Sequence, residues 1–458
     1  MSKPRFRVLK AASLGILLLA GCTSTTPTAV DSTRPSILFV HDNGENAAAW
    51  QTTLWRFESN GWPAERLHTL DLPYPFARDD DTRPQAGRSS SADFMAHLKA
   101  EVASIQARNG NQRVILVGAG RGANAVRNYV QNGGLGSVSH AVLAAPFSHG
   151  IWAVKGLREQ SEFSGLSTFI TTLNRPKDAQ GNEVPAGVQW LTIRSDRNDK
   201  FAQPTGEWIG SPLLSTNIRY NSPEVRGAQT VILDGADHRE SAYSARAFDA
   251  MYRFITREAP KTGEITTERV ARLDGIISGV DSQAGGFPSN LPLSGARIEV
   301  YPVDPDTGIR TGKAVHAQTV DASGRWGSFE ADPQQTYEFV LSARGYPTHH
   351  VYRSPFPRSS RVVNFRLQRI VHADPDARAI VVMTRPRGYF DLRRDTMSLG
   401  RTVPPPGIPP RGAGVSVSRM KSLSDTPETV VARFNDERVA GRTWPLAEKR
   451  VVYLELTH

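Results

Sequence analysis

Residues 36–260 are predicted to form an α/β domain with a doubly wound, mostly parallel sheet, and the chain after them an antiparallel all-β region. Three observations support this. Short apolar segments alternate with amphipathic helical ones in the first part. A glycine-rich turn, G-A-G-R-G at 118–122, separates an apolar strand from a helix. Beyond residue 263 apolar and polar residues alternate between clusters of Gly, Pro, Asn and Asp, which is typical of antiparallel strands.

Residues 1–22 are predicted to be a lipoprotein signal peptide. Basic residues come first, an apolar stretch spans 11–20, and Leu-Ala-Gly precedes Cys22. The apolar stretch is too short to span a membrane, and the Leu-Ala-Gly-Cys segment resembles the lipobox of bacterial lipoproteins. That resemblance implies lipidation of Cys22 and a lipid-anchored protein of the cell envelope, with the outer membrane favoured because Thr23 follows the cysteine. The alternative is an ordinary secretory signal with an incidental cysteine.

The remaining elements follow in order. Residues 23–35, rich in Ser, Thr and Pro, are predicted to be a flexible tether. Strands are predicted at 36–41, 66–72, 113–118, 140–146, 188–195 and 230–234, and helices at 92–107, 123–130 and 242–256. A β-sandwich or barrel is predicted at 268–370. After it, 371–458 form either a second β-module or the completion of one barrel.

Charge and cysteine content exclude several function classes. The 458-residue chain has a formal net charge of +10, but its Lys and Arg residues are scattered and form no basic stripe with aromatic side chains. We therefore expect no nucleic-acid partner. Cys22 is the only cysteine, so no intramolecular disulfide can form. The sequence shows no metal cluster or phosphate-binding fingerprint, and no cofactor is implied; the spacing at 118–122 is not that of a dinucleotide loop.

The glycine-rich turn has the form of a nucleophile elbow whose nucleophile is missing. In the G-x-S-x-G pattern, the central serine stands on a sharp corner between a strand and a helix and attacks an acyl carbon. Here Gly120 occupies the central position. The sequence thus predicts the scaffold of a serine hydrolase with a degenerate nucleophile position.

Other hydrolase residues are predicted from their order and from the strands that they follow. His238 lies on a loop after the last predicted strand, where a general base is expected. Asp196 and Asp199 both follow the preceding strand; Asp199 is predicted to be the acid, with Asp196 as the alternative, because its offset from the strand and from Pro204 suits the usual acid turn. The order of nucleophile position, acid and histidine is that of α/β-hydrolases.

The expected oxyanion hole consists of the backbone N–H groups of Asn43 and Arg121. Asp42 stands where hydrolases of this type usually have glycine. A carboxylate beside the hole opposes a developing oxyanion. The sequence alone leaves open whether Asp42 faces the hole or the solvent.

The segment from 36 to 259 resembles bacterial lipases and esterases of the α/β-hydrolase fold. The resemblance lies in the H-x-N-G-x-x-A-x-x-W segment at 41–50, the elbow with the helix that follows it, and A-P-F-S-H-G at 145–150. The C-terminal part, especially G-R-W-G-S-F-E at 324–330, is similar to the β-barrel-type domain that follows the hydrolase domain in such lipases. The resemblance implies a lid at about 148–187 and a β-domain that helps to engage the acyl chain.

Several functions remain open at this point. The leading hypothesis is a carboxylic-ester hydrolase homologue, a pseudoenzyme that binds an acyl ester, a lipid-like small molecule or an oligomer. A second is an active hydrolase in which His238 and Asp199 activate water, or in which Ser148 supplies a hydroxyl. A third is an ordinary lipase with an altered residue at Gly120. A fourth is an envelope structural lipoprotein that binds a partner or glycan, supported if Trp326, Tyr346 and Tyr352 form an exposed patch. Oligomeric state is not predicted.

Overall fold

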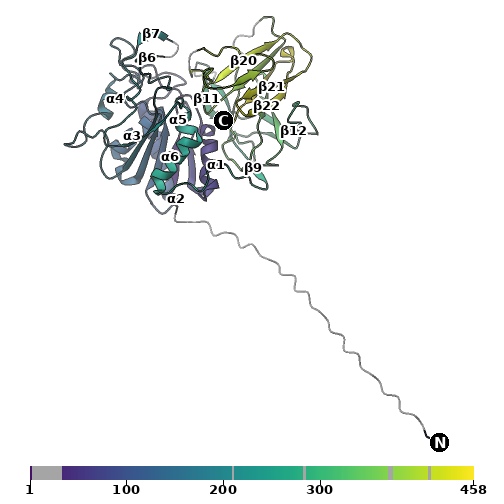
Figure 1. The fold of residues 1–458 in the computed structure, drawn as a ribbon, viewed down its shortest axis with the longest axis horizontal. Helices are drawn as coiled ribbons and strands as arrows, with labels where there is room; N and C mark the ends of the chain where they lie inside the picture. Colours follow the sequence, from purple (N-terminus) through teal and green to yellow (C-terminus); the bar gives the residue numbers. More distant parts are fainter. Residues whose placement is uncertain (3–33, 209–210, 282–284, 370–374, 411–413) are drawn as a thin grey trace.

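The N-terminal part of the protein is a layered α/β domain that lies beside a C-terminal region built from strands (Figure 1). The computed structural model describes residues 1–2, 34–208, 211–281, 285–369, 375–410 and 414–458. Residues 3–22 of the predicted signal peptide, Cys22 among them, and most of the predicted tether lie outside the described residues. No helix among the described residues is both long enough and apolar enough to cross a membrane.

The first domain is organised around a six-stranded parallel sheet in the order β2-β1-β3-β4-β5-β8. Its strands are β1 (Ile37–Val40), β2 (Leu67–Leu70), β3 (Val114–Ala119), β4 (Val138–Ala144), β5 (Gln189–Ser195) and β8 (Gln229–Leu233). All six predicted strands are present. The short strands β6 (Glu207–Trp208) and β7 (Ser211–Ser215) form a separate pair.

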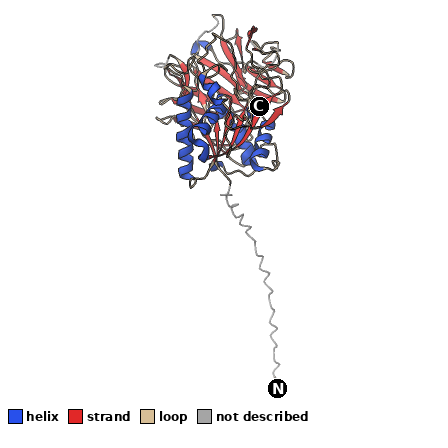
Figure 2. Ribbon diagram, turned by 90° about the vertical axis from the view of Figure 1, so that its left-hand side faces the viewer, coloured by secondary structure: helices blue, strands red, loops and turns tan. Residues whose placement is uncertain are grey.

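Helices cover both faces of this sheet, as Figure 2 shows. The helices are α1 (Gln51–Ser59), α2 (Ser91–Arg108), α3 (Arg121–Tyr129), α4 (Thr168–Leu173), α5 (Glu240–Tyr243) and α6 (Ala245–Thr256). Phe57 of α1 and Phe248 of α6 pack on the sheet face that contains Phe39. Phe94 of α2 and Val126 of α3 pack on the opposite face. This is the doubly wound arrangement that the sequence predicts. Short helical turns are η1 (Ala47–Trp50), η2 (Ala64–Arg66), η3 (Val130–Gly134), η4 (Leu135–Ser137) and η5 (Leu446–Glu448).

The C-terminal region contains several β-sheets. Its strands are β9 (Ala271–Leu273), β10 (Ile277–Asp281), β11 (Phe287–Pro292), β12 (Arg297–Val303), β13 (His316–Thr319), β14 (Phe329–Ala331), β15 (Thr336–Ser342), β16 (Thr348–Arg353), β17 (Phe365–Arg366), β18 (Ala379–Thr384), β19 (Met397–Leu399), β20 (Val417–Ser422), β21 (Thr429–Phe434), β22 (Glu437–Arg442) and β23 (Arg450–Glu455). The largest sheet has the order β13-β12-β15-β16-β23-β18-β20.

This region departs from a purely antiparallel arrangement in two places. Most strand pairs are antiparallel, but β10 pairs with β17 in parallel, and β23 runs parallel to both of its neighbours, β16 and β18. Strands from 268–370 and from 371–458 therefore share one sheet. In the described part of the chain the sheets remain open, and no closed barrel of the kind suggested by the resemblance to lipases is found.

Buried charges connect the two parts of the molecule near the carboxyl edge of the parallel sheet. Arg385, just after β18, lies 2.7 Å from Glu240 and 3.3 Å from Asp237, both on the loop and helix that follow β8. The backbone N–H of Tyr389 also donates to Asp237 at 2.7 Å. The C-terminal region thus contacts the same loop that contains His238.

Candidate active site

The glycine-rich turn adopts the geometry of a nucleophile elbow. Strand β3 ends at Ala119, Gly120 has φ +48° and ψ −111°, and α3 begins at Arg121. A non-glycine residue adopts such a φ only under strain, as the nucleophile of an elbow does. Gly122 is required by close approach, because a Cβ there would lie 2.6 Å from the carbonyl oxygens of Val40 and His41. The local structure of an elbow is therefore complete apart from its central side chain.

The space of the missing side chain is filled by Asp42. An ideal Cβ built on Gly120 would lie 2.0 Å from Oδ1 of Asp42 and 2.5 Å from its Oδ2. Atoms that are not bonded to each other cannot approach so closely. Consequently the carboxylate of Asp42 and any side chain at position 120 exclude each other in this arrangement. Asp42 therefore faces the expected oxyanion hole and not the solvent.

The predicted oxyanion donors bind this same carboxylate. The backbone N–H of Arg121 donates to Oδ1 of Asp42 at 2.6 Å, and hydrogen bonding from the backbone of Asn43 further stabilises the charged form. Burial by itself raises the pKa of Asp42, but hydrogen bonds and the charge of His238 outweigh it and lower that pKa. A stable anion thus occupies the place where an oxyanion would form.

His238 lies between two carboxylates. Its Nδ1 is 2.8 Å from Oδ2 of Asp199, and its Nε2 is 3.2 Å from Oδ2 of Asp42. Burial lowers the pKa of His238, but the attraction of Asp199 and Asp42 outweighs burial and raises it to about 10. With a carboxylate on each side both ring nitrogens donate, so the ring is an imidazolium. An imidazolium has no free lone pair with which to remove a proton from water.

The other predicted candidates do not face this histidine. Asp196 accepts a hydrogen bond from the backbone N–H of Gly235 at 3.0 Å and pairs with Arg197. Of the two predicted acids, only Asp199 reaches His238. The hydroxyl of Ser148 is buried and donates to the carbonyl oxygen of Pro223 at 2.7 Å, so it is engaged away from the elbow.

Aromatic side chains cover the histidine. The ring of Phe147 stacks on His238 with centroids 4.9 Å apart and an interplanar angle of 8°, and Phe201 packs edge-on at 4.9 Å. Phe147 belongs to a small apolar cluster with Ile151 and Trp152 of the predicted lid. The space above the histidine is consequently filled by the protein itself.

A buried ion pair fastens the predicted lid segment to the elbow. The guanidinium of Arg121, the first residue of α3, lies 2.6 Å from Glu162, and both side chains are almost fully buried. Arg121 also donates to the carbonyl oxygens of Pro75 and Ser89. Breaking a buried pair of this kind leaves an uncompensated charge and costs about 3–5 kcal/mol. This contact holds the segment against the elbow.

The aromatic patch that would support the structural-lipoprotein hypothesis is absent at the expected residues. Trp326 and Tyr352 are fully buried in the β-region, and Tyr346 is half-buried. The described residues also contain no group of three or more His, Cys, Asp or Glu side chains able to hold a metal ion.

Comparison with known proteins gives one family match, in the C-terminal region, and solved structures that are similar at low identity. The family model of the Lipase C-terminal domain matches residues 270–370. No curated protein sequence matches the chain. The structure of Bacillus licheniformis lipase BlEst2 in mature form is similar at 16% identity over 51% of this chain and 95% of that chain, with a TM-score of 0.35. Phospholipase PlaB from Legionella pneumophila is similar at 12% identity over 75% of this chain and 97% of that chain, with a TM-score of 0.34.

The strand order, the elbow and the family match together define the architecture. The first domain has the parallel six-stranded sheet and the strand–turn–helix elbow of an α/β-hydrolase-like fold, and residues 270–370 of the region that follows match the Lipase C-terminal domain. The aromatic cover of His238 was not predicted from the sequence. A signal was present, because Phe147 follows β4 and Phe201 follows Asp199, both at the carboxyl edge where ligands of such sheets bind.

Proposed function

We propose that this protein is a catalytically silent relative of lipases and esterases, which binds an acyl compound and does not hydrolyse it. The observation that carries the proposal is the position of the Asp42 carboxylate. It occupies the space of the nucleophile at Gly120, the N–H groups of the oxyanion hole and the Nε2 face of His238. One side chain thereby removes three parts of the hydrolytic machinery.

The alternative of direct water activation is less well supported. A general base must be unprotonated at the working pH, whereas two carboxylates raise the pKa of His238 to about 10. Oδ2 of Asp42 also lies 3.2 Å from Nε2, on the side of the ring where a water molecule giving up its proton would have to stand. These contacts favour loss of hydrolysis over a nucleophile-free mechanism.

We also propose, from the sequence, that Cys22 carries a lipid anchor and that the protein is held at the cell envelope, with the outer membrane favoured. The acyl ligand would then come from the surrounding lipid or from an acylated small molecule or oligomer. This part of the proposal depends on the Leu-Ala-Gly-Cys segment alone.

Restoring the missing parts tests the proposal. We expect the parent to release no p-nitrophenol from a panel of p-nitrophenyl esters above the blank. The single variant Gly120→Ser remains inert, because the new side chain collides with Asp42. The double variant Asp42→Gly/Gly120→Ser empties the oxyanion hole and returns the hydroxyl, so its turnover rises by roughly a hundredfold or more.

A third substitution, His238→Ala, is the control, since it should abolish the activity of the double variant. Hydrolysis by the parent that disappears with His238→Ala would overturn the proposal. A folded but inert double variant would also contradict it, because the fold would then retain no usable hydrolase site.

A further inference from the structure

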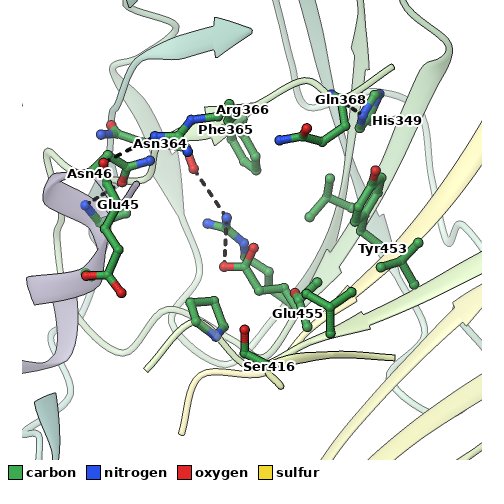
Figure 3. Close-up of a pocket in the computed structure, with 18 of the residues that line it drawn as sticks. Glu45, Asn46, His349, Asn364, Phe365, Arg366, Gln368, Ser416, Tyr453 and Glu455 are labelled. Atoms are coloured by element: carbon green, nitrogen blue, oxygen red, sulfur yellow. Dashed lines mark hydrogen bonds and ion pairs between the residues drawn. The ribbon is translucent and has the colours of Figure 1, made fainter. Parts of the chain in front are cut away.

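A cavity of about 540 Å³ lies where the α/β domain meets the large C-terminal sheet (Figure 3). Such a volume is within the range of sites for small organic molecules. The loop after β1, including Glu45 and Asn46, lies on one side, and β16 and β23 with His349 and Tyr453 lie opposite. The segment from Asn364 to Gln368 lines a further side.

The sheet contributes two cross-strand rows to this cavity. Val351, Tyr453 and Val382 are register partners on adjacent strands and form a largely apolar row. Two residues further along the same strands, Arg353, Glu455 and Thr384 form a polar row. Residues two apart on a strand share a face, so both rows line the same surface. The cavity is therefore amphipathic, with an apolar strip beside a charged one.

Cations outnumber anions in the lining. Five arginines line the cavity, against two glutamates: Arg239, Arg353, Arg366, Arg387 and Arg419, with Glu45 and Glu455. Both glutamates are already paired, since Glu45 lies 3.0 Å from Arg239 and Glu455 lies 2.9 Å from Arg353. The lining thus retains a positive charge that its own carboxylates do not neutralise.

Two of these arginines have only neutral partners. Arg366 donates to the carbonyl oxygens of Gly44 at 2.8 Å and Glu45 at 3.2 Å. Arg387, 6% exposed, donates to the carbonyl oxygen of Ala48 at 2.8 Å. Neither guanidinium forms an ion pair with a carboxylate in the described part of the chain, and in both the Nε–H is buried without a hydrogen-bond partner. Burial lowers the pKa of each to about 10, and neighbouring acids offset it only partly.

Uncompensated buried cations are costly unless an anion is brought to them. We propose that this cavity binds an amphipathic carboxylate, the free acid of an acyl chain, with its head group near Arg366 and Arg387 and its chain along Val351 and Val382. The inference rests on the proposed function for the acyl class of ligand, and it adds that the charged acid is preferred over the neutral ester. The guanidinium fork suits a planar carboxylate.

Isothermal titration calorimetry of the purified protein with decanoate tests this inference. We expect saturable binding by decanoate and at least tenfold weaker binding by decanol, which has the same chain length and no charge. Acetate tests the head group alone and should bind weakly, because it leaves the apolar row empty. Decyl phosphate distinguishes a phosphate head group from a carboxylate, and binding tighter than that of decanoate would reassign the ligand and overturn the choice of a carboxylate.

Two substitutions should move the affinity in opposite directions. Arg387→Gln removes a charge while keeping an amide donor, and we expect decanoate to bind about tenfold more weakly. Glu455→Gln removes an acid and releases Arg353, so binding should tighten severalfold. Glu330→Gln is the matched control, since that carboxylate is 64% exposed and pairs with Arg272; it should leave the dissociation constant unchanged.

Equal binding of decanol and decanoate would overturn the inference, as would an unchanged affinity in Glu455→Gln. Glu455→Gln keeps the test valid if Arg387→Gln fails to fold. The experiment measures heat and contains no ester. Its failure is therefore distinct from failure of the proposed function, which is detected as ester hydrolysis by the parent.

Discussion

The surroundings of Gly120 and the cavity beside the C-terminal sheet differ in how their buried charges are balanced. At the first, one imidazolium lies between the carboxylates of Asp42 and Asp199, and backbone N–H groups bind the remaining oxygen. At the second, Arg387 is buried and Arg366 is half-buried, and neither forms an ion pair with a carboxylate in the described structure. The charges of the first site are paired with one another, whereas the two carboxylates of the second pair with Arg239 and Arg353 and leave Arg366 and Arg387 with neutral partners only.

Under the proposed function, the comparison illustrates how the groups of a catalytic centre can serve a structural role. A working triad keeps a histidine nitrogen and two N–H groups available for the transition state. Here the same three groups hold Asp42, so an arrangement that would stabilise a reaction intermediate stabilises the resting fold instead. The proposed ligand site is the neighbouring cavity. One wall of this cavity includes the ion pair between Glu45 and Arg239, which are close in sequence to Asp42 and His238.

Breaking the buried cluster should have the largest effect on stability. Asp199→Asn leaves His238 with one carboxylate in a buried setting, and we expect the free energy of unfolding at pH 7 to fall by about 3–5 kcal/mol. Chemical denaturation measures this change. Asp249→Asn is the control: this carboxylate is 42% exposed in a pair with Arg253 on α6, so its loss should cost less than about 0.5 kcal/mol. Equal losses of unfolding free energy in Asp199→Asn and Asp249→Asn would show that the carboxylate beside His238 stabilises the fold no more than one in an exposed ion pair.

The dependence of the free energy of unfolding on pH should be a smaller effect than that of Asp199→Asn, and it should arise from His238. The pKa of His238 is raised to about 10 in the folded protein from an ordinary value of 6.5. Its contribution is therefore fully present below pH 6.5 and is lost as the pH rises toward 10, because the folded state keeps a proton that the unfolded chain releases.

We expect the parent to lose a few kcal/mol of unfolding free energy across that window, and Asp42→Asn to lose distinctly less. Denaturation series at intervals between pH 6.5 and 10 provide the measurement. If the free energy of unfolding depended on pH in the same way in the parent and in Asp42→Asn, the account of His238 as an imidazolium held by Asp42 and Asp199 would be contradicted.

Most of the α/β domain was predictable from the sequence because its signals are local. The six strands are short apolar runs, and the glycines at 118–122 allow a sharp turn that few other residues permit. Helix α1 was not predicted, since Gln51, Thr52 and Thr53 weaken its apolar pattern although all three are buried. The parallel pairing of β23 was also missed, because strand direction depends on contacts far apart in sequence.

The residues of the site could be predicted from the sequence, but the contacts between them could not. His238, Asp199 and Asp42 were singled out by their places after strands, and the structure brings all three together. That Asp42 points at Gly120 depends on the packing of β1 against β3, which no local pattern records. The arginine-rich cavity gave no sequence signal, because its lining comes from segments hundreds of residues apart.

Nuclear magnetic resonance of the His238 side chain tests the central claim most directly. In protein labelled with ¹⁵N, the account predicts that both ring nitrogens remain protonated through pH 8, with titration only near pH 10, and that Asp42→Asn lowers this pKa. A neutral ring at pH 8 in the parent, titrating near 6.5, would contradict the account, because Nε2 would then be free to act as a base.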